Sequence, residues 1–364
     1  MCIRDSTGPD RPRLTPAPGP DRPGTGVYPG RMRPTSFSPA AGSPVLVLLE
    51  TDADGAPAPR LADPAVPHLS VTDQGVTRGD GIFETALAVA DGLGTLRMRK
   101  LGAHLGRLAA SASALELAAP EAAAWEAAVA LGLRSFTEAN DVAPGDRLAV
   151  RLTVTRGPDA APGAVPAPTA WALLSPAPAV EDEERQRGLR VLLLDRGIDS
   201  QAPERSPWLL TGAKTLSYAV NMAALRYARA HGADDVVFTS ADGYLLEGPT
   251  STVLIVRTGE DGVRRLLTPL RQKGILAGTS QAVIFAAAHA DGWELGYGPL
   301  VPADLKGAEG VWLVSSVRGV LPVRAVDGVE IPVDHELTGM LQAHLDADGD
   351  PGRHVNGDPV PTAG

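Results

Sequence analysis

The sequence has little of several things that would point to particular classes of protein. Its 364 residues include one cysteine, Cys2, so no intramolecular disulfide can form and a reducing compartment is the natural setting. No apolar run approaches the ~18 residues that a membrane span needs. The net charge is −10 and basic residues do not cluster, which argues against nucleic acid or an anionic membrane as a partner. We therefore expect a cytoplasmic protein that acts on small molecules, without a metal site.

Lysine is also scarce, and this makes Lys214 informative. The chain has four lysines among its 33 lysine and arginine residues, and Lys214 lies within the apolar segment 208–218. A guanidinium stays protonated, whereas a desolvated ammonium can lose its proton and form an imine. Glu247 follows in a turn between two predicted strands. An imine-forming lysine and a carboxylate that can pair with a pyridinium nitrogen are what a pyridoxal phosphate enzyme requires of its protein.

Composition divides the chain into four parts. Residues 1–43 are rich in Pro, Gly, Arg and Ser without a hydrophobic period, so we predict a disordered extension. Its opening differs from the rest in character, and one interpretation places the native start near Met32. The polar tail 347–364 is also predicted to be disordered. Between them we expect a small N-terminal α/β domain, 44–178, and a larger C-terminal domain, 179–346.

Hydrophobic periodicity predicts alternating strands and helices between these tails. Leu101, Leu105 and Leu108 recur at helical spacing, for example, and form one apolar stripe. Predicted helices span 99–117, 120–139, 217–230 and 279–290. Predicted strands span 45–49, 81–89, 147–155, 171–174, 190–194, 235–239, 251–256, 266–268 and 311–315, with a hairpin at 323–328. This mixture predicts an α/β (α+β) fold.

Six short motifs occur in an order that resembles a known enzyme family. They are Gly79–Glu84, His104–Leu108, Lys214–Tyr218, Glu247–Thr252, Gly278–Ser280 and Ser315–Arg318. The series resembles the class IV (fold type IV) pyridoxal phosphate enzymes, over roughly residues 44–335. This family includes branched-chain and D-amino acid aminotransferases and aminodeoxychorismate lyases. The resemblance implies a two-domain, D-amino acid aminotransferase-like fold, a homodimer, and pyridoxal 5'-phosphate bound between the domains, mainly by the larger one.

The resemblance also assigns roles to individual residues. Lys214 corresponds to the Schiff-base lysine and Glu247 to the partner of the pyridine nitrogen. The phosphate ligands would be Arg107, Thr279, Ser280 and Ser316. Hydroxyls, one arginine and the N–H groups at a helix N-terminus together suit a dianion. Tyr218 would contact the ring hydroxyl, and Glu84 and Arg318 would face the substrate.

Two motifs depart from the family pattern. Thr252 stands where the family usually has Asn, and the usual Gly-Ile-Thr-Arg phosphate loop reads Gly-Thr-Ser-Gln from Gly278 onward. These departures leave open how Thr279 and Ser280 divide the phosphate between them.

Each candidate also has a plain structural interpretation. Lys214 could be a surface lysine before a helix, and Glu247 an ordinary turn residue. Arg107 could lie along the edge of the leucine stripe. His104 is better explained as a structural hydrogen-bonding residue than as a catalyst. Asp80, between two glycines, is typical of a turn.

The resemblance leaves two reactions open. Transamination and aminodeoxychorismate cleavage share imine exchange and removal of the Cα proton; the lyase then releases pyruvate and forms 4-aminobenzoate. Segments 77–85 and 212–222 most resemble actinobacterial proteins assigned as 4-amino-4-deoxychorismate lyases, so we predict that lyase, in folate biosynthesis. The alternative is a class IV aminotransferase for D-amino or branched-chain amino acids. A non-catalytic, phosphate-binding relative is a third hypothesis, and the presence of Lys214 and Glu247 argues against it.

Overall fold

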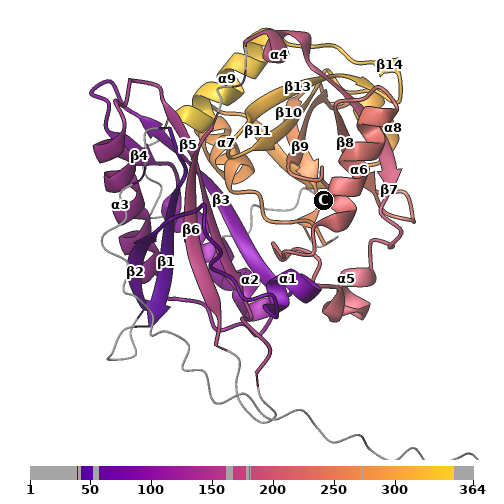
Figure 1. The fold of residues 1–364 in the computed structure, drawn as a ribbon. Helices are drawn as coiled ribbons and strands as arrows, with labels where there is room; N and C mark the ends of the chain where they lie inside the picture. The colour runs from indigo at the N-terminus through magenta and orange to yellow at the C-terminus, as the bar shows by residue number, and fades with distance from the viewer. Residues whose placement is uncertain are drawn as a thin grey trace, which may run out of the picture. The chain divides into compact units, whose positions relative to one another are not determined.

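The computed structural model describes residues 39, 42–51, 57–160, 167–177, 180, 182–271 and 274–347. The predictions of disorder for 1–43 and 347–364 therefore fall almost entirely outside the described residues. Residues 37–364 cluster as one compact unit, and the fold below is that of its described part (Figure 1). None of the described helices is both long and apolar enough for a membrane span.

The first half of this unit forms a six-stranded antiparallel sheet in the order β2-β1-β6-β5-β3-β4. Its strands are β1 Val45–Thr51, β2 Pro57–Ala62, β3 Gly81–Ala90, β4 Leu96–Met98, β5 Arg147–Thr155 and β6 Thr169–Pro176. Helices α2 (Leu101–Ala114) and α3 (Ala122–Ala139) cover one face, and their leucines and aromatics share a core with the strands. The short helix α1 (Gln74–Arg78) precedes β3.

Alternation along β5 decides which side chains face away from those helices. Leu148, Val150 and Leu152 are buried in the core beneath α2 and α3. Successive side chains of a strand point to opposite faces, so Arg147 and Arg151 lie on the other face of the sheet. That face is turned toward the second half of the unit.

The second half forms an eight-stranded mixed sheet in the order β11-β10-β9-β12-β13-β7-β8, with β14 paired to β13. Its strands are β7 Leu189–Asp195, β8 Asp235–Thr239, β9 Thr252–Thr258, β10 Arg264–Pro269, β11 Glu294–Gly298, β12 Gly310–Ser315, β13 Gly319–Val326 and β14 Val329–Glu330. The pairs β7–β8, β7–β13 and β10–β11 are parallel and the others are antiparallel. This combination confirms the predicted α/β (α+β) class.

Helices pack on both sides of the second sheet. Helices α7 (Thr279–Ala290) and α9 (His335–Asp346) share a core with β9, β12 and β13, whereas α6 (Ala219–Ala230) packs on β8. Shorter elements complete the unit. They are α4 Asp182–Arg187, α5 Ala202–Arg205, a 3-10 helix at Pro207–Leu209, and α8 Pro302–Lys306.

The segment around Lys214 ties the two halves together. Phe83 donates its backbone N–H to the Lys214 carbonyl (3.0 Å), and Leu216 donates to the Gly81 carbonyl (2.8 Å). These bonds pair the segment with the first residues of β3, beyond the part of that strand that β4 covers. Backbone groups at a sheet edge need partners, so the pairing fixes the backbone of Lys214 against the first sheet.

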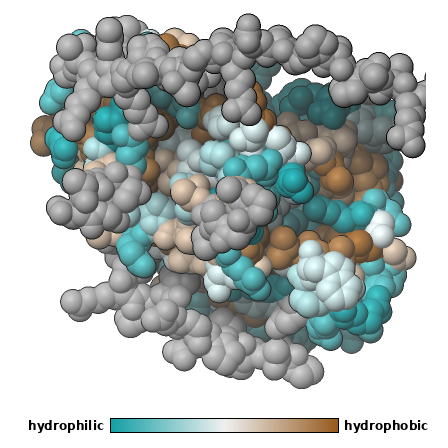
Figure 2. Space-filling model, turned by 60° about the horizontal axis from the view of Figure 1, so that its bottom comes forward, coloured by the Kyte–Doolittle hydropathy of each residue, from teal (hydrophilic) through white to brown (hydrophobic). Residues whose placement is uncertain are grey.

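Several large apolar side chains of the second half are exposed. Trp208 is 73% exposed and Val220 58%. Seen from the lower side of Figure 1, the surface carries brown apolar patches among hydrophilic residues (Figure 2).

Candidate active site

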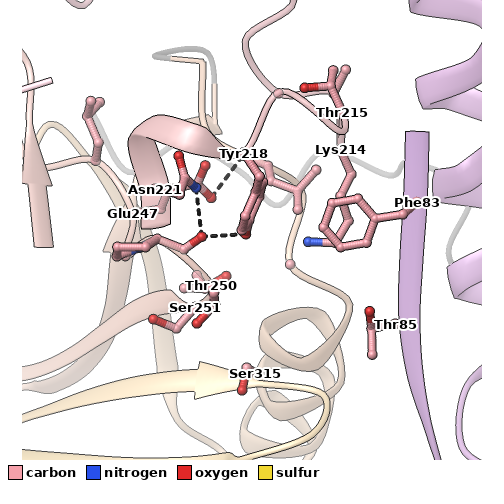
Figure 3. Close-up of a pocket in the computed structure, with 18 of the residues that line it drawn as sticks. Phe83, Thr85, Lys214, Thr215, Tyr218, Asn221, Glu247, Thr250, Ser251 and Ser315 are labelled. Atoms are coloured by element: carbon pink, nitrogen blue, oxygen red, sulfur yellow. Dashed lines mark hydrogen bonds between the residues drawn. The ribbon is translucent and has the colours of Figure 1, made fainter. Parts of the chain in front are cut away.

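A cavity of about 520 Å³ opens between the two sheets. Most of the residues predicted for the site line it: Arg107, Lys214, Tyr218, Glu247, Thr279, Ser280, Ser316 and Arg318. Strand β3 contributes Phe83 and Thr85 to the opposite wall (Figure 3). Motifs that are far apart in the sequence therefore line one cavity.

Lys214 projects into this cavity beside aromatic rings. Its Nζ lies 4.6 Å from the centre of the Phe83 ring and 5.8 Å from that of Tyr218. Its backbone N–H donates to Ser111 Oγ on α2, at 3.0 Å. Burial, with the nearby positive charge of Arg107, lowers the pKa of Lys214 to about 8. Roughly one molecule in ten then carries the neutral, nucleophilic amine at pH 7.

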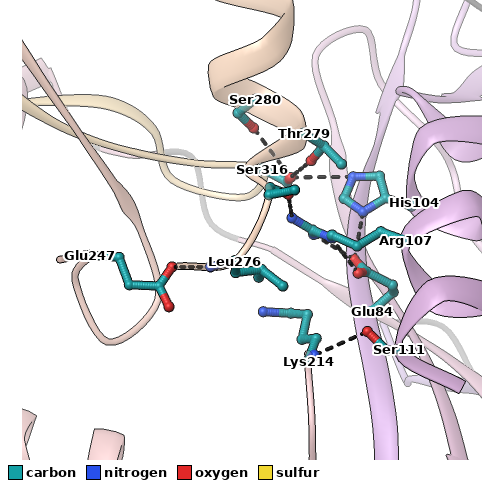
Figure 4. Close-up of polar contacts among 11 residues, drawn as sticks. Glu84, His104, Arg107, Ser111, Lys214, Glu247, Leu276, Thr279, Ser280 and Ser316 are labelled. Atoms are coloured by element: carbon teal, nitrogen blue, oxygen red, sulfur yellow. Dashed lines mark hydrogen bonds and ion pairs between the residues drawn. The ribbon is translucent and has the colours of Figure 1, made fainter. Parts of the chain in front are cut away.

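Glu247 lies on the other side of Lys214 from Arg107 (Figure 4). It follows β8, and its Oε2 accepts a hydrogen bond from the Leu276 N–H at 3.2 Å. Burial raises the pKa of Glu247 to about 7, and the charges of Lys214 and Arg196 only partly oppose this. A cation placed against this carboxyl group would ionise it, so the site suits a protonated ring nitrogen.

Three hydroxyl groups gather at the other end of the cavity. Ser316 Oγ lies 3.4 Å from Thr279 Oγ1 and 3.3 Å from Ser280 Oγ. Helix α7 begins there, and its N-cap residue Gly278 provides no side-chain hydrogen bond. A Cβ on Gly278 would lie 2.4 Å from Thr252 Oγ1, so glycine lets the start of α7 approach β9. We call the side-chain hydroxyls of Thr279, Ser280 and Ser316 the hydroxyl cluster. Together with the uncapped N–H groups at the start of α7, this cluster forms a cradle for an anion.

A buried carboxylate holds Arg107 beside this cradle. Glu84 Oε1 accepts from Arg107 Nε (2.6 Å), and Oε2 accepts from Arg107 Nη2 (2.7 Å). Nη1 of Arg107 donates to the Ala277 carbonyl at 2.7 Å, which leaves one N–H on each terminal nitrogen for an anion. Burial raises the pKa of Glu84, but the hydrogen bonds from His104 and Arg107 outweigh it and hold that pKa at about 2.

Glu84 itself is not among the lining residues, so its predicted contact with substrate has no support in this geometry. The carboxylate points toward α2, where it also lies 2.7 Å from His104 Nδ1. Burial lowers the pKa of His104, so the neutral ring donates from Nδ1 to Glu84. Its Nε2, 3.3 Å from Ser316 Oγ, is then an acceptor for that hydroxyl. Glu84 therefore orients Arg107 directly and Ser316 through His104.

Tyr218 lines the cavity, but its hydroxyl has a protein partner. It donates to the Pro249 carbonyl at 2.5 Å, and Asn221 Nδ2 donates to the same oxygen at 2.7 Å (Figure 3). Burial raises the pKa of Tyr218. Tyr218 and Asn221 thus hold the turn that follows Glu247. In this position the Tyr218 ring packs edge-on against the Phe83 ring.

Two arginines of the cavity were missed from the sequence. Arg151 lies with its guanidinium 3.9 Å from the centre of the Phe83 ring, and Arg196 lies 4.7 Å from that of Phe238. Within the described part of the chain neither is ion-paired, whereas Arg318 pairs with buried Asp235 at 2.5 Å. Burial lowers the pKa of Arg151. The cavity therefore offers two guanidinium groups to an anionic ligand.

Comparison with known proteins matches this geometry. The model of the amino-transferase class IV family matches residues 81–326. This chain belongs to the class IV aminotransferases. These enzymes depend on pyridoxal phosphate, and the anion cradle, Lys214 and Glu247 fit its phosphate, aldehyde and ring nitrogen.

Individual class IV relatives are similar over most of their length. The bifunctional aminodeoxychorismate lyase / D-amino acid transaminase of Mycobacterium tuberculosis is 41% identical over 75% of this chain and 90% of its own. A fold IV transaminase from Curtobacterium pusillum is 40% identical, with a TM-score of 0.72 over 84% of this chain and 100% of that one. A hypothetical aminotransferase from Mycobacterium tuberculosis in its PLP-bound form is 38% identical, with a TM-score of 0.71 over 83% and 99%.

Proposed function

We propose that this class IV enzyme is a 4-amino-4-deoxychorismate lyase, which converts its substrate into pyruvate and 4-aminobenzoate for folate biosynthesis. The observation that carries the proposal is that the buried amine of Lys214 shares its cavity with two guanidinium groups, Arg151 and Arg196, neither of which is ion-paired among the described residues. Aminodeoxychorismate carries an amine and two carboxylates, so its charges complement this cavity.

In this proposal, Arg107 and the hydroxyl cluster would hold the cofactor phosphate. Glu247 would pair with its ring nitrogen, and the amine of Lys214 would face its aldehyde carbon until a substrate amine takes that place. The cofactor, when bound, supplies a covalent link to amines and a ring that withdraws electrons from the carbon beside the nitrogen. Glu84 maintains the orientation of Arg107, because both of its oxygens are bonded to that guanidinium.

The chain's own groups then position the substrate and move its proton. Arg151 and Arg196 bind the carboxylates and fix the ring, while the Phe83 ring shields the amine of Lys214 from water. Lys214 removes the proton from the carbon that bears the amine; a base with a pKa near 8 is well matched to this step at neutral pH. The enolpyruvyl group leaves as the ring becomes aromatic. The leaving group gains a proton and becomes pyruvate, so the overall reaction neither releases nor consumes a proton.

D-amino acid transamination is the second candidate, because a relative 41% identical is named for both reactions. The same lysine and the same carboxylate-binding arginines would serve a D-amino acid and a keto acid. Branched-chain amino acids have one carboxylate, so they would leave one of the two unpaired guanidinium groups, Arg151 or Arg196, without an anion.

Three reactions distinguish these candidates. Purified protein loaded with cofactor receives aminodeoxychorismate without a keto acid, D-alanine with 2-oxoglutarate, or leucine with 2-oxoglutarate, and 4-aminobenzoate and glutamate are measured. We expect 4-aminobenzoate from the first. Lys214→Ala should abolish it, whereas Lys306→Ala should not, because Lys306 is a surface residue 3.8 Å from Asp327. If glutamate forms and no 4-aminobenzoate forms, the enzyme is a transaminase and not a lyase.

We further propose that the enzyme is a cytoplasmic homodimer. Leu209 and Met222 line the cavity and are also exposed, and the exposed residues Trp208 and Val220 lie within two positions of them in the chain. Exposed apolar groups of this kind are typical of protein interfaces. Light scattering of purified protein tests the dimer, and a monomer at micromolar concentration would contradict it.

A further inference from the structure

A second cavity, of about 760 Å³, lies beyond the hydroxyl cluster. Ser280 and Ser316 line both cavities, and His104 lines the second. Its walls come from β3, β5, α2, α4 and α9. Nothing in the proposed reaction uses this cavity, whose size is in the range of small-molecule sites.

The wall of the second cavity is strongly cationic. Arg99, Lys100, Arg147 and Arg185 line it, and Asp346 is the one carboxylate among its described lining residues. Asp346 is ion-paired with Arg99. Lys100 Nζ donates to the Leu345 carbonyl (3.0 Å), and Arg185 Nη1 donates to Gln342 Oε1 (2.7 Å). The amide oxygen of Gln342 is neutral, so it satisfies a hydrogen bond of Arg185 without balancing its charge.

Arg147 gives this cavity an unsatisfied donor. Its Nε is buried and has no hydrogen-bond partner among the described residues, while its Nη2 donates to the Val317 carbonyl. Burial, followed by the positive charges of Arg185 and Arg99, lowers the pKa of Arg147. A buried donor without an acceptor is costly, and three guanidinium groups within electrostatic reach of one another repel. An anion in the cavity would relieve both costs.

We propose that the second cavity is a binding site for a small polyanion, a ligand with at least two phosphate or carboxylate groups. The arginines carry the recognition, because a planar guanidinium offers paired N–H groups that match both kinds of oxyanion. A ligand with more than one anionic group can contact Arg147 and Arg185 at once, which a single chloride cannot. The site lies next to the cofactor's phosphate cradle, and Ser280 and Ser316 line both.

Isothermal titration of the cofactor-loaded enzyme tests this, with pyrophosphate in one arm and citrate in the other. Loaded enzyme is used so that the cofactor phosphate already fills the cradle. We expect at least one probe to bind at one site per chain, and the stronger one indicates whether the natural ligand is a phosphate or a polycarboxylate. Binding should weaken with salt, since charge drives it.

Two arginines on the same helix provide the matched comparison. Arg185→Gln should weaken binding about tenfold or more, the loss of one charge-assisted contact. Arg187→Gln should bind like the parent, because Arg187 is 52% exposed and faces Asp234 at 3.6 Å. Arg147→Gln should weaken binding as Arg185→Gln does, and both variants should keep the parent's circular dichroism.

Several results would overturn the proposal. One is that neither probe binds to the loaded enzyme. Another is equal affinity for the parent and Arg185→Gln. Loss of binding in Arg151→Gln would place the probe in the first cavity instead. If the probe binds only to a chain that ends at Ala347, the cationic wall faces the acidic residues that follow Ala347 and not a free ligand.

Discussion

Replacing Glu84 by glutamine tests how the buried carboxylate supports Arg107. Glutamine keeps the size of the side chain but removes its charge, and it turns one acceptor oxygen into a donor that meets the N–H groups of Arg107 or His104. Glu84 is fully buried and its ion pair with Arg107 is formed through both oxygens. The substitution therefore leaves the guanidinium of Arg107, whose side chain is 13% exposed, without its counter-charge.

Two independent routes give the same size of effect. The pKa of Glu84 is lowered from 4.5 to about 2, and each pH unit of such a shift corresponds to about 1.4 kcal/mol, which gives about 3 kcal/mol. Removing one partner of a buried ion pair is known to cost about 3–5 kcal/mol. We expect Glu84→Gln to lower the free energy of unfolding by about 3 kcal/mol at pH 7.

The pH dependence has a definite sign. Because the pKa of Glu84 is lower in the folded chain, its contribution is complete well above pH 4.5 and is lost as the pH falls toward 2. The gap between parent and variant should shrink from about 3 kcal/mol at pH 7 to about 1 kcal/mol at pH 3. Urea unfolding of cofactor-free protein, followed by the fluorescence of buried Trp125 and Trp312, measures it at a fixed protein concentration.

A surface pair of similar geometry is the control. Glu50 binds Arg60 through both oxygens, at 2.9 and 2.6 Å, yet their side chains are 43% and 38% exposed. Glu50→Gln should cost at most about 1 kcal/mol, because solvent screens exposed pairs. If Glu84→Gln costs no more than Glu50→Gln, or if its cost does not shrink in acid, the carboxylate does not hold Arg107 as described.

Three further predictions concern the first cavity. Arg107→Ala should raise the dissociation constant of the cofactor about tenfold or more in equilibrium dialysis. If the variant binds the cofactor as tightly as the parent, Arg107 does not bind its phosphate. Arg151→Gln should raise KM for aminodeoxychorismate about tenfold or more in steady-state kinetics, while Arg60→Gln should not. If Arg151→Gln has the same KM as the parent, Arg151 does not bind the substrate. Acylation of Lys214 in cofactor-free protein, read by mass spectrometry, should increase through about pH 8 because burial favours the neutral amine; a midpoint near 10.5 would contradict this.

Elements with a regular apolar stripe were predictable from the sequence. The predicted strand 147–155 is β5, and the predicted helix 99–117 contains α2, which ends earlier, at Ala114. The missed elements lack such a stripe. Strand β2 contains two prolines and only Ala62 is buried, and it forms at the sheet edge because β1 supplies its hydrogen bonds. Helix α9 has a mixed polar sequence and is held by a core shared with α7.

The same limit explains what was found and missed in the site. Motif order brought Lys214 and Glu247 into one prediction, and both line the first cavity. The direction of Glu84 could not be predicted, because β3 is buried on both faces and its residues show no alternation. For Arg151 the alternation of β5 does reveal the face, shared with Arg147. What covers that face depends on the second sheet, which the local sequence does not encode.

Strand β5 therefore links the two cavities. Arg147 and Arg151 lie four residues apart on one face, roughly 13 Å at the usual rise of a strand, and one lines each cavity. Burial lowers the pKa of both, so each guanidinium loses hydration that a solvent-exposed arginine would keep. An ordinary core strand would carry apolar residues at both positions. Two desolvated cations at even spacing are explained if each faces an anion: a substrate carboxylate at Arg151, in line with the proposed function, and a polyanion at Arg147.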